Sequence, residues 1–285
     1  MSFKLIYIWF LPPLVLVLAA GTLYALNMAD KWQLQRINSS AQDMATPTVE
    51  QYDPQMVANL PKAAQRYFAF SIQPGTQLQA RVRLQMQGEL GLGDNDKPNY
   101  FEFTARQIIV PEKGFTWALR SKGFPMVIGG SDVMWGDQSW TRFWLYGLVP
   151  VAREGGTKDH FRAAEGRYLI ELAAWSPAAL LPQYGVEWEE VDANKARAWV
   201  TTSTGRHGIE ISVDERGAPT AYKIERWSNA NPASQFQYQP FGGTPERFVD
   251  IDGMQIAQKV IVGNHFGTPD YFPFFKAELT KIEFF

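Results

Sequence analysis

The stretch AAEGRYLIELAAWSPAALLPQYGVEWEEVD, residues 163–192, decides the fold because it carries the longest helical signal in a sequence that otherwise has the pattern of strands. Its first half places large apolar residues at positions i, i+1, i+4 and i+7, namely Tyr168, Leu169, Leu172 and Trp175. This spacing gathers them into one stripe and is typical of a helix that lies on a sheet. We therefore expect a helix over residues 163–174 at the centre of the fold.

A second, shorter helix is predicted directly after the first. Ser176 is a preferred N-cap residue, Pro177 is favoured at the first helical position, and Pro182 would end the helix after Leu181. The two helices would form a bent plug that a curved sheet can enclose. The residues that we expect to shape this centre, or a ligand pocket beside it, are Tyr168, Leu172, Trp175, Pro177, Leu181, Pro182 and Trp188.

Elsewhere the apolar residues recur with a period of two, the pattern of half-buried strands. The clearest case begins at Gln77, after which apolar residues alternate with Gln and Arg; these are Leu78, Ala80, Val82, Leu84 and Met86. Further strands are predicted at residues 100–110, 115–120, 124–128, 139–149, 186–191, 196–202, 208–213, 221–227, 236–238, 247–251, 254–263 and 276–285.

Short turns join most of these strands, for example at Arg216-Gly217 and Asp252-Gly253. Short connections indicate antiparallel pairing, because a parallel crossover needs roughly a dozen residues or more. A sheet of about a dozen strands has to curl, split or close on itself. We therefore predict a β-rich α+β fold, in which a large curved antiparallel sheet forms a half-barrel around central helices, with an N-terminal transmembrane helix in addition.

The N-terminal segment Leu5–Leu26 contains 22 residues without a charge. At about 1.5 Å per residue, such a helix spans a hydrocarbon core of roughly 30 Å. The alternative is a cleaved signal peptide, because Ala19, Ala20 and Gly21 offer small residues at a cleavage site. The apolar run continues past them, which favours an uncleaved anchor. We divide the chain into an anchor (1–30), a polar tether (31–53) and one β-rich domain (54–285).

The charge pattern excludes some partners. The chain has 285 residues, 27 basic and 29 acidic, and the basic ones are scattered, so we expect no nucleic-acid partner. It has no cysteine, which excludes disulfides and thiolate metal sites. The three histidines lack zinc-motif spacing, and the turn around Asp94 lacks the glycine and distal glutamate of a calcium loop. We expect no metal and no cofactor.

The sequence gives little evidence for catalytic residues. Glu187 and Glu189 alternate with Trp188 on a predicted strand, which places both carboxylates on a solvated face. Ser176 lacks the glycine elbow of a serine nucleophile. Glu171 is the most interesting carboxylate, because it lies in the apolar helix four residues after Arg167 and can pair with it. These residues predict no catalytic site.

A family resemblance rests on several motifs. The most specific is the run from Trp175 to Trp188, which contains Trp-Ser-Pro-Ala-Ala-Leu-Leu-Pro and Gly-Val-Glu-Trp. The others are Leu60-Pro61, Arg66-Tyr67, the run 103–107 with 114–117, and the run 147–151. Over residues 58–285 the chain resembles a bacterial family of unknown function, DUF6544. The resemblance implies no activity and no catalytic residues.

Three functions remain open at this stage. A curved sheet around helices resembles the carriers and sensors of lipids and lipoproteins in the bacterial envelope, which favours a protein that binds an apolar ligand. The second is a structural or interaction module with a filled core, and the third is an enzyme. For each, we expect a single-pass protein of the bacterial inner membrane, attached through residues 5–26, with its large domain in the periplasm.

Overall fold

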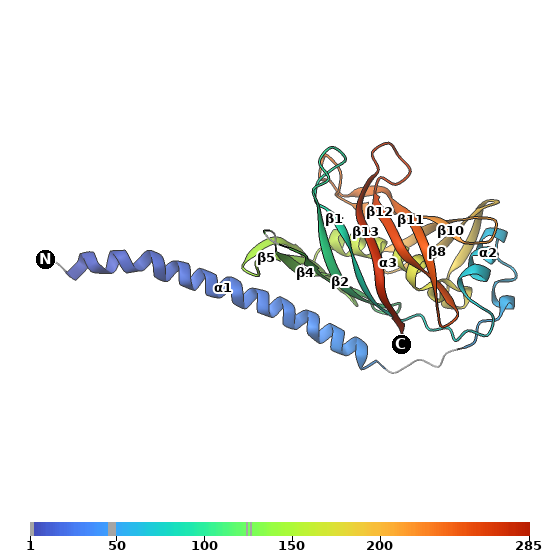
Figure 1. The fold of residues 1–285 in the computed structure, drawn as a ribbon, viewed down its shortest axis with the longest axis horizontal. Coiled ribbons are helices and arrows are strands. Elements are labelled where there is room, and N and C mark those ends of the chain that lie inside the picture. The colour runs from blue at the N-terminus through green and yellow to red at the C-terminus, as the bar shows by residue number, and fades with distance from the viewer. Residues whose placement is uncertain (1–2, 45–49, 124, 126) are drawn as a thin grey trace.

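One antiparallel sheet dominates the structure. The computed structural model describes residues 3–44, 50–123, 125 and 127–285, with side chains from residue 12, and this part of the chain forms a sheet of thirteen strands (Figure 1). The strands are β1 (Val82–Gly91), β2 (Tyr100–Val110), β3 (Gly114–Ser121), β4 (Ile128–Trp135), β5 (Gln138–Leu145), β6 (Val149–Gly155), β7 (Glu187–Asp192), β8 (Lys195–Thr202), β9 (Gly205–Val213), β10 (Pro219–Ser228), β11 (Gln237–Ile251), β12 (Met254–Asn264) and β13 (Phe272–Phe284).

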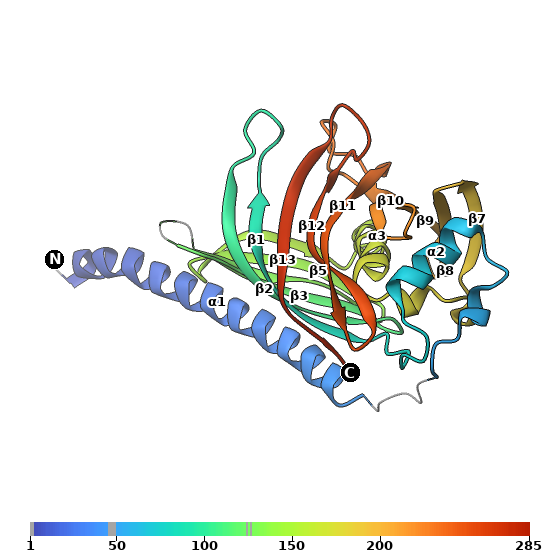
Figure 2. The same cartoon turned by 45° about the vertical axis from the view of Figure 1, so that its right-hand side comes forward.

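The thirteen strands form one continuous sheet that curves. It runs β6-β5-β4-β3-β2-β1-β13-β12-β11-β10-β9-β8-β7, and every neighbouring pair is antiparallel. The connection from β6 to β7 joins the two edges of the sheet, and it contains the helix α3 (Lys158–Trp175). The sheet curls around this helix (Figures 1 and 2). The predicted curved antiparallel sheet around a central helix is confirmed.

The central helix is longer than predicted. It begins after Thr157, whose hydroxyl accepts a hydrogen bond from the backbone N–H of His160 at 3.1 Å. The predicted second helix is wrong in detail: Pro177–Leu180 and Pro182–Tyr184 form two separate 3₁₀ turns, so Pro182 starts a turn. Four residues between the prolines are too few for an α-helix. The Ser176 side chain does not cap the turn that follows it, because its hydroxyl donates to the carbonyl of Ala80 at 2.5 Å.

Several strand boundaries also differ from the prediction. The first strand begins at Val82, so Leu78 and Ala80 precede it. The run predicted as one strand at 139–149 forms β5 and β6, because Tyr146 and Gly147 both have positive φ and reverse the chain. The runs 236–238 and 247–251 belong to one strand, β11. Most of β4 was not predicted, because Gly129 and Gly130 weaken its strand signal.

Smaller helices cover the far end of the curved sheet. The 3₁₀ turn η1 (Pro54–Val57) leads into α2 (Lys62–Ser71), which packs against β8 and β9. Tyr67 and Phe68 of α2 contact the ring of Trp188, and the Tyr67 hydroxyl donates to the carbonyl of Ala173 at 2.9 Å. The Tyr67 hydrogen bond joins the C-terminal end of α3 to α2.

The N-terminal helix corrects the predicted tether. Residues 31–42, expected in a polar tether, continue the helix α1 (Phe3–Gln42), which runs along the outer face of the sheet (Figure 2). No glycine or proline interrupts the sequence from Thr22 to Gln42, and its polar side chains find partners. Thr116 of β3, for example, donates to Asn38 at 2.7 Å. Ala41 packs beside Phe285 at the C-terminus.

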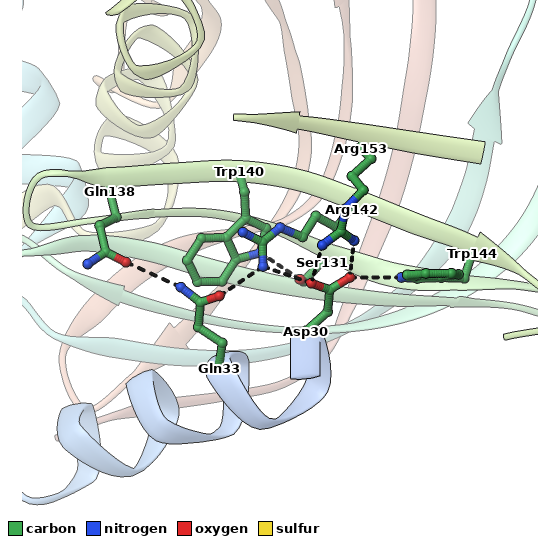
Figure 3. Close-up of polar contacts among 8 residues, drawn as sticks. All are labelled: Asp30, Gln33, Ser131, Gln138, Trp140, Arg142, Trp144 and Arg153. Atoms are coloured by element: carbon green, nitrogen blue, oxygen red, sulfur yellow. Dashed lines mark hydrogen bonds and ion pairs between the residues drawn. The ribbon is translucent and has the colours of Figure 1, made fainter. Parts of the chain in front are cut away.

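Asp30 fastens α1 to the sheet (Figure 3). This buried carboxylate accepts hydrogen bonds from Arg142 at 2.9 Å, from Arg153 at 3.1 Å and from the indole of Trp144 at 3.1 Å. Gln33, one turn later, accepts from Arg142 at 2.9 Å. Charge-assisted hydrogen bonds of this kind are about twice as strong as neutral ones.

The substitution Asp30→Ala should release α1 from the sheet. It leaves two arginines without their carboxylate, and we expect a loss of about 3 kcal/mol, the lower end for a broken buried pair, because the side chain of Arg153 is 40% exposed. Hydrogen exchange of the full chain in detergent measures the effect as faster exchange over residues 27–42. The control is Gln35→Ala, an exposed site on the same helix. Unchanged protection in Asp30→Ala would contradict the prediction.

Candidate ligand-binding cavity

A cavity of about 580 Å³ lies between α3 and the concave face of the sheet. Small-molecule sites typically measure roughly 300–1,000 Å³. Its walls are mainly apolar, and they come from both halves of the sheet: Leu90, Leu92, Phe101, Trp117, Leu119, Ile128, Phe143, Leu145, Val151, Tyr222, Phe241, Val260, Val262, Phe274 and Phe275. The strands that supply them are far apart in sequence, so the cavity exists only in the folded sheet.

One face of α3 forms the remaining wall. Arg167, Ile170, Glu171, Ala174 and Trp175 line the cavity, and their spacing of three and four residues puts them on one side of a helix. The next face of the helix, with Tyr168 and Leu172, is buried in the core. The helix therefore presents two charged residues to a mainly apolar space.

An ionic network ties this helix face to the sheet. Arg167 forms ion pairs with Glu171 at 2.8 Å and with Asp132 of β4. Gln107 of β2 donates to the other oxygen of Glu171 at 2.5 Å. The Arg167 guanidinium also lies 4.8 Å from the ring centres of Phe115 and Trp117. The Arg167–Glu171 pair predicted from the i, i+4 spacing is confirmed.

Burial shifts the protonation of these groups. Desolvation raises the pKa of Glu171, although Arg167 and Gln107 favour its charged form. Desolvation disfavours the charge of Arg167, but Glu171 and Asp132 outweigh it and its pKa is raised. Burial and the ion pair therefore act in opposite directions on the pKa of Glu171.

Arg226 of β10 is the second arginine on the cavity wall. Its Nε donates to the carbonyl of Ala163 at 2.8 Å, and in the described part of the chain it has no ion pair. Burial lowers the pKa of Arg226 to about 10, with the Arg167 charge acting in the same direction, so it stays protonated at neutral pH. Gly166 makes room for it, because a Cβ there would lie 2.9 Å from Arg226 Cγ.

A polar chain extends the network behind the cavity wall. Thr141, which lines the cavity, donates to Asp132 at 2.9 Å and contacts His160 Nε2 at 3.1 Å. His160 Nδ1 lies 2.8 Å from the hydroxyl of Ser139. Because the Thr141 hydroxyl donates its proton to Asp132, it can only accept from His160 Nε2. Nε2 therefore carries the imidazole proton, and Nδ1 accepts from Ser139. This tautomer is the neutral form of the ring.

The predicted pocket-shaping residues lie in different places. Trp175 lines the cavity, and its indole donates to the carbonyl of Ala257 at 3.2 Å. The other six are not among the lining residues: Tyr168, Leu172, Pro177 and Leu181 are buried in the core, while Pro182 and Trp188 are half-buried beneath α2 or beside it. Trp188 donates to the carbonyl of Leu180 at 3.0 Å, which holds the 3₁₀ turns in place.

Sequence analysis missed Asp132 and Arg226, and one of them had a usable signal. Tyr222, Ile224 and Arg226 alternate along β10, and the first two are core residues. A strand period of two puts Arg226 on the same inward face. Arginine is rarely found on such a face unless it is paired, so its position there indicates a polar site. Asp132 had no comparable signal, because the strand that carries it was only partly predicted.

The fold and the cavity define a class of protein: an open antiparallel sheet curled around one helix, with a ligand-sized hollow on its concave side. Within this class the chain belongs to DUF6544, described as a family of unknown function, whose family model matches residues 50–277. The predicted family is therefore confirmed. None of the curated proteins matches the sequence.

Some solved structures are similar in overall shape. A LolA superfamily protein from Nitrosomonas europaea has 8% identity and a TM-score of 0.39, with 78% of this chain and 91% of that chain covered. A DUF1329 family protein from Desulfovibrio piger has 9% identity and a TM-score of 0.38, with 78% and 90% covered.

The neutral His160 should make stability depend on pH. Burial lowers its pKa below the unfolded value of 6.5, despite Asp132 and Glu154. The unfolded chain therefore binds the proton first, so this stabilisation is complete above pH 6.5 and is lost as the pH falls through the folded pKa. We expect His160→Gln to flatten the pH dependence of urea unfolding, followed by tryptophan fluorescence on both sides of pH 6.5.

The matched control is His265→Gln at the β12–β13 turn, outside this network. It tests whether any histidine replacement changes the profile. A His160→Gln profile that follows the wild type across the whole range would show that the ring does not titrate as predicted.

Proposed function

We propose that this protein binds an amphiphile, with the apolar part of the ligand in the cavity and an acidic head group on Arg226. We further propose that its N-terminal helix holds it in the inner membrane of a bacterium, with the large domain in the periplasm. The observation that carries the proposal is the combination of an apolar cavity of about 580 Å³ with one half-buried arginine that forms no ion pair among the described residues.

The wall chemistry supports an amphiphile over a purely apolar ligand. Aromatic rings and aliphatic side chains from ten strands surround the space and favour a hydrocarbon chain. Arg167 already forms ion pairs with two carboxylates. Arg226 donates to the Ala163 carbonyl and lies 4.8 Å from the centre of the Phe241 ring, while Asp132 and Glu171 act on its charge without forming an ion pair among the described residues. A carboxylate or phosphate on the ligand would supply the missing charge, since a guanidinium matches both geometrically.

The helix α1 supports membrane attachment. Among the described residues it is the one helix long and apolar enough to cross a membrane, by length and composition, over Pro12–Gln42. A signal sequence near an N-terminus would pass the same test. Leu14, Leu16 and Leu18 are exposed, as lipid-facing residues would be.

Filling the cavity should abolish ligand binding without loss of the fold. Ala174 of α3 lines the space, and Ala174→Phe would occupy part of it. We expect the full chain in detergent to lose uptake of a fluorescent fatty acid and to show no retained lipid mass in native mass spectrometry. Ala233→Phe, at an exposed loop, is the control. Equal binding by Ala174→Phe and the control would rule the cavity out as the site.

The head-group assignment predicts a loss of selectivity in Arg226→Met. A charged hydrogen bond contributes about 1.5–3 kcal/mol, so the wild type should prefer a fatty acid over the alcohol of equal length by roughly tenfold or more. The variant should bind both equally, as measured by displacement of a fluorescent probe. Arg206→Met, on a half-exposed surface pair with Glu187, is the control. A preference that survives in Arg226→Met would place the head group elsewhere.

A further inference from the structure

The turn between β5 and β6 exposes a cluster of large apolar side chains. Tyr146 is 51% exposed, Leu148 43%, Val149 50% and Val151 50%. All four lie within six residues, on a hairpin whose second strand is an edge of the sheet. Exposed apolar clusters mark contacts with another apolar surface, and edge strands normally carry charges instead. We call these four residues the hairpin patch.

The structure fixes the hairpin patch next to the end of the apolar helix. Asn27 of α1 donates from its side chain to the carbonyl of Gly147 at 2.5 Å, and a Cβ on Gly147 would come within 3.0 Å of Asn27. Asn27 is the residue directly after the uncharged run Leu5–Leu26. With a rise of about 1.5 Å per residue, the tip of the hairpin lies at the level where a membrane span would end.

The ion pairs of Asp30 hold this arrangement rigid. Arg142 lies on β5 and Arg153 on β6, so both strands of the hairpin bond to the same carboxylate on α1 (Figure 3). The hairpin and the helix therefore keep one fixed depth relative to each other. Tyrosine, present in the patch as Tyr146, is also enriched at membrane–water interfaces.

The same hairpin forms part of the cavity wall. Leu145, Val151 and Ala152 line the cavity, and Val151 is also a member of the hairpin patch. Leu145 pairs with Val149 across the two strands. An apolar surface thus continues from the exposed tip of the hairpin to the interior of the cavity.

We propose that the hairpin patch inserts into the surface of the bilayer that holds α1, so that the cavity exchanges its ligand directly with membrane lipid. The inference rests on the proposed membrane span of α1. It adds a second membrane contact and a route for the ligand. The occupant is a lipid surface because the patch is continuous with the end of the span and is held at its level by Asn27 and Asp30.

Single cysteines can test the insertion, since the native chain contains none. Leu148→Cys and Val149→Cys would be labelled with the environment-sensitive dye NBD in the full chain, reconstituted in nanodiscs of phosphatidylethanolamine and phosphatidylglycerol. We expect a blue-shifted emission and a loss of intensity when lipids with a doxyl quencher near the head group are included. Leu16→Cys reports the span, and Tyr184→Cys, exposed in the 3₁₀ turn near α2, reports water.

Two results would overturn the proposal. In the first, the label at Leu16 is quenched while those at 148 and 149 behave like the label at Tyr184, so the span is in the bilayer and the hairpin is not. In the second, none of the labels is quenched, so the helix is not in the bilayer and the hairpin has no membrane to enter.

A transfer assay separates this inference from ligand binding itself. The double variant Leu148→Asp/Val149→Asp should bind a fluorescent fatty acid supplied from detergent as the wild type does, but take it up more slowly from vesicles. Equal uptake from vesicles would argue against the route. If the wild type binds no fatty acid at all, the proposed function fails, while the quenching experiment still decides whether the hairpin inserts.

Discussion

The ion pairs of Arg167 are the interaction on which the rest of the structure depends. The pair with Asp132 joins the helix that crosses the concave face to β4 of the sheet, and Glu171, the other partner of Arg167, accepts a hydrogen bond from Gln107 of β2. Buried ion pairs rarely stabilise more than well-packed apolar residues of the same size would. A filled apolar core would therefore have been the simpler way to hold α3. The charges, together with Arg226, make better sense as a polar lining for a ligand, and this supports the binding proposal.

The second constraint is the attachment of α1. Asp30 would be costly to bury without partners, and it accepts hydrogen bonds from Arg142 and Trp144 of β5 and from Arg153 of β6. Because α1 is one continuous helix from the apolar segment to Gln42, these few bonds fix the orientation of the sheet relative to that segment. A flexible tether, as first expected, would have left the orientation free.

Much of the fold could be predicted from sequence, because periodicity is a local property. The stripe Tyr168 to Trp175 located α3, and the alternation from Val82 to Met86 located β1. The site was harder. Its lining comes from many strands, so only the topology brings Trp117, Phe275 and Arg226 together. The sequence pattern pointed to the Trp175–Trp188 motif, most of which packs in the core. Tightly packed residues leave no room for a ligand, so the motif did not locate the cavity. Whether those residues influence a ligand stays a prediction.

The continuation of α1 through residues 31–42 was missed for a related reason. Residues such as Asn38 and Ser39 look like linker residues when no partner is known, because polar side chains satisfy their hydrogen bonds in water equally well. Only the register of the sheet places Thr116 opposite Asn38 and the hairpin opposite Asn27 and Asp30. Once these contacts exist, the apolar side chains at the hairpin tip gain a fixed position beside the end of the apolar helix. Their exposure would be a liability in water. Beside a bilayer this exposure would be favourable. The contacts that hold α1 on the sheet would then also keep the cavity next to the membrane lipids from which it takes its ligand.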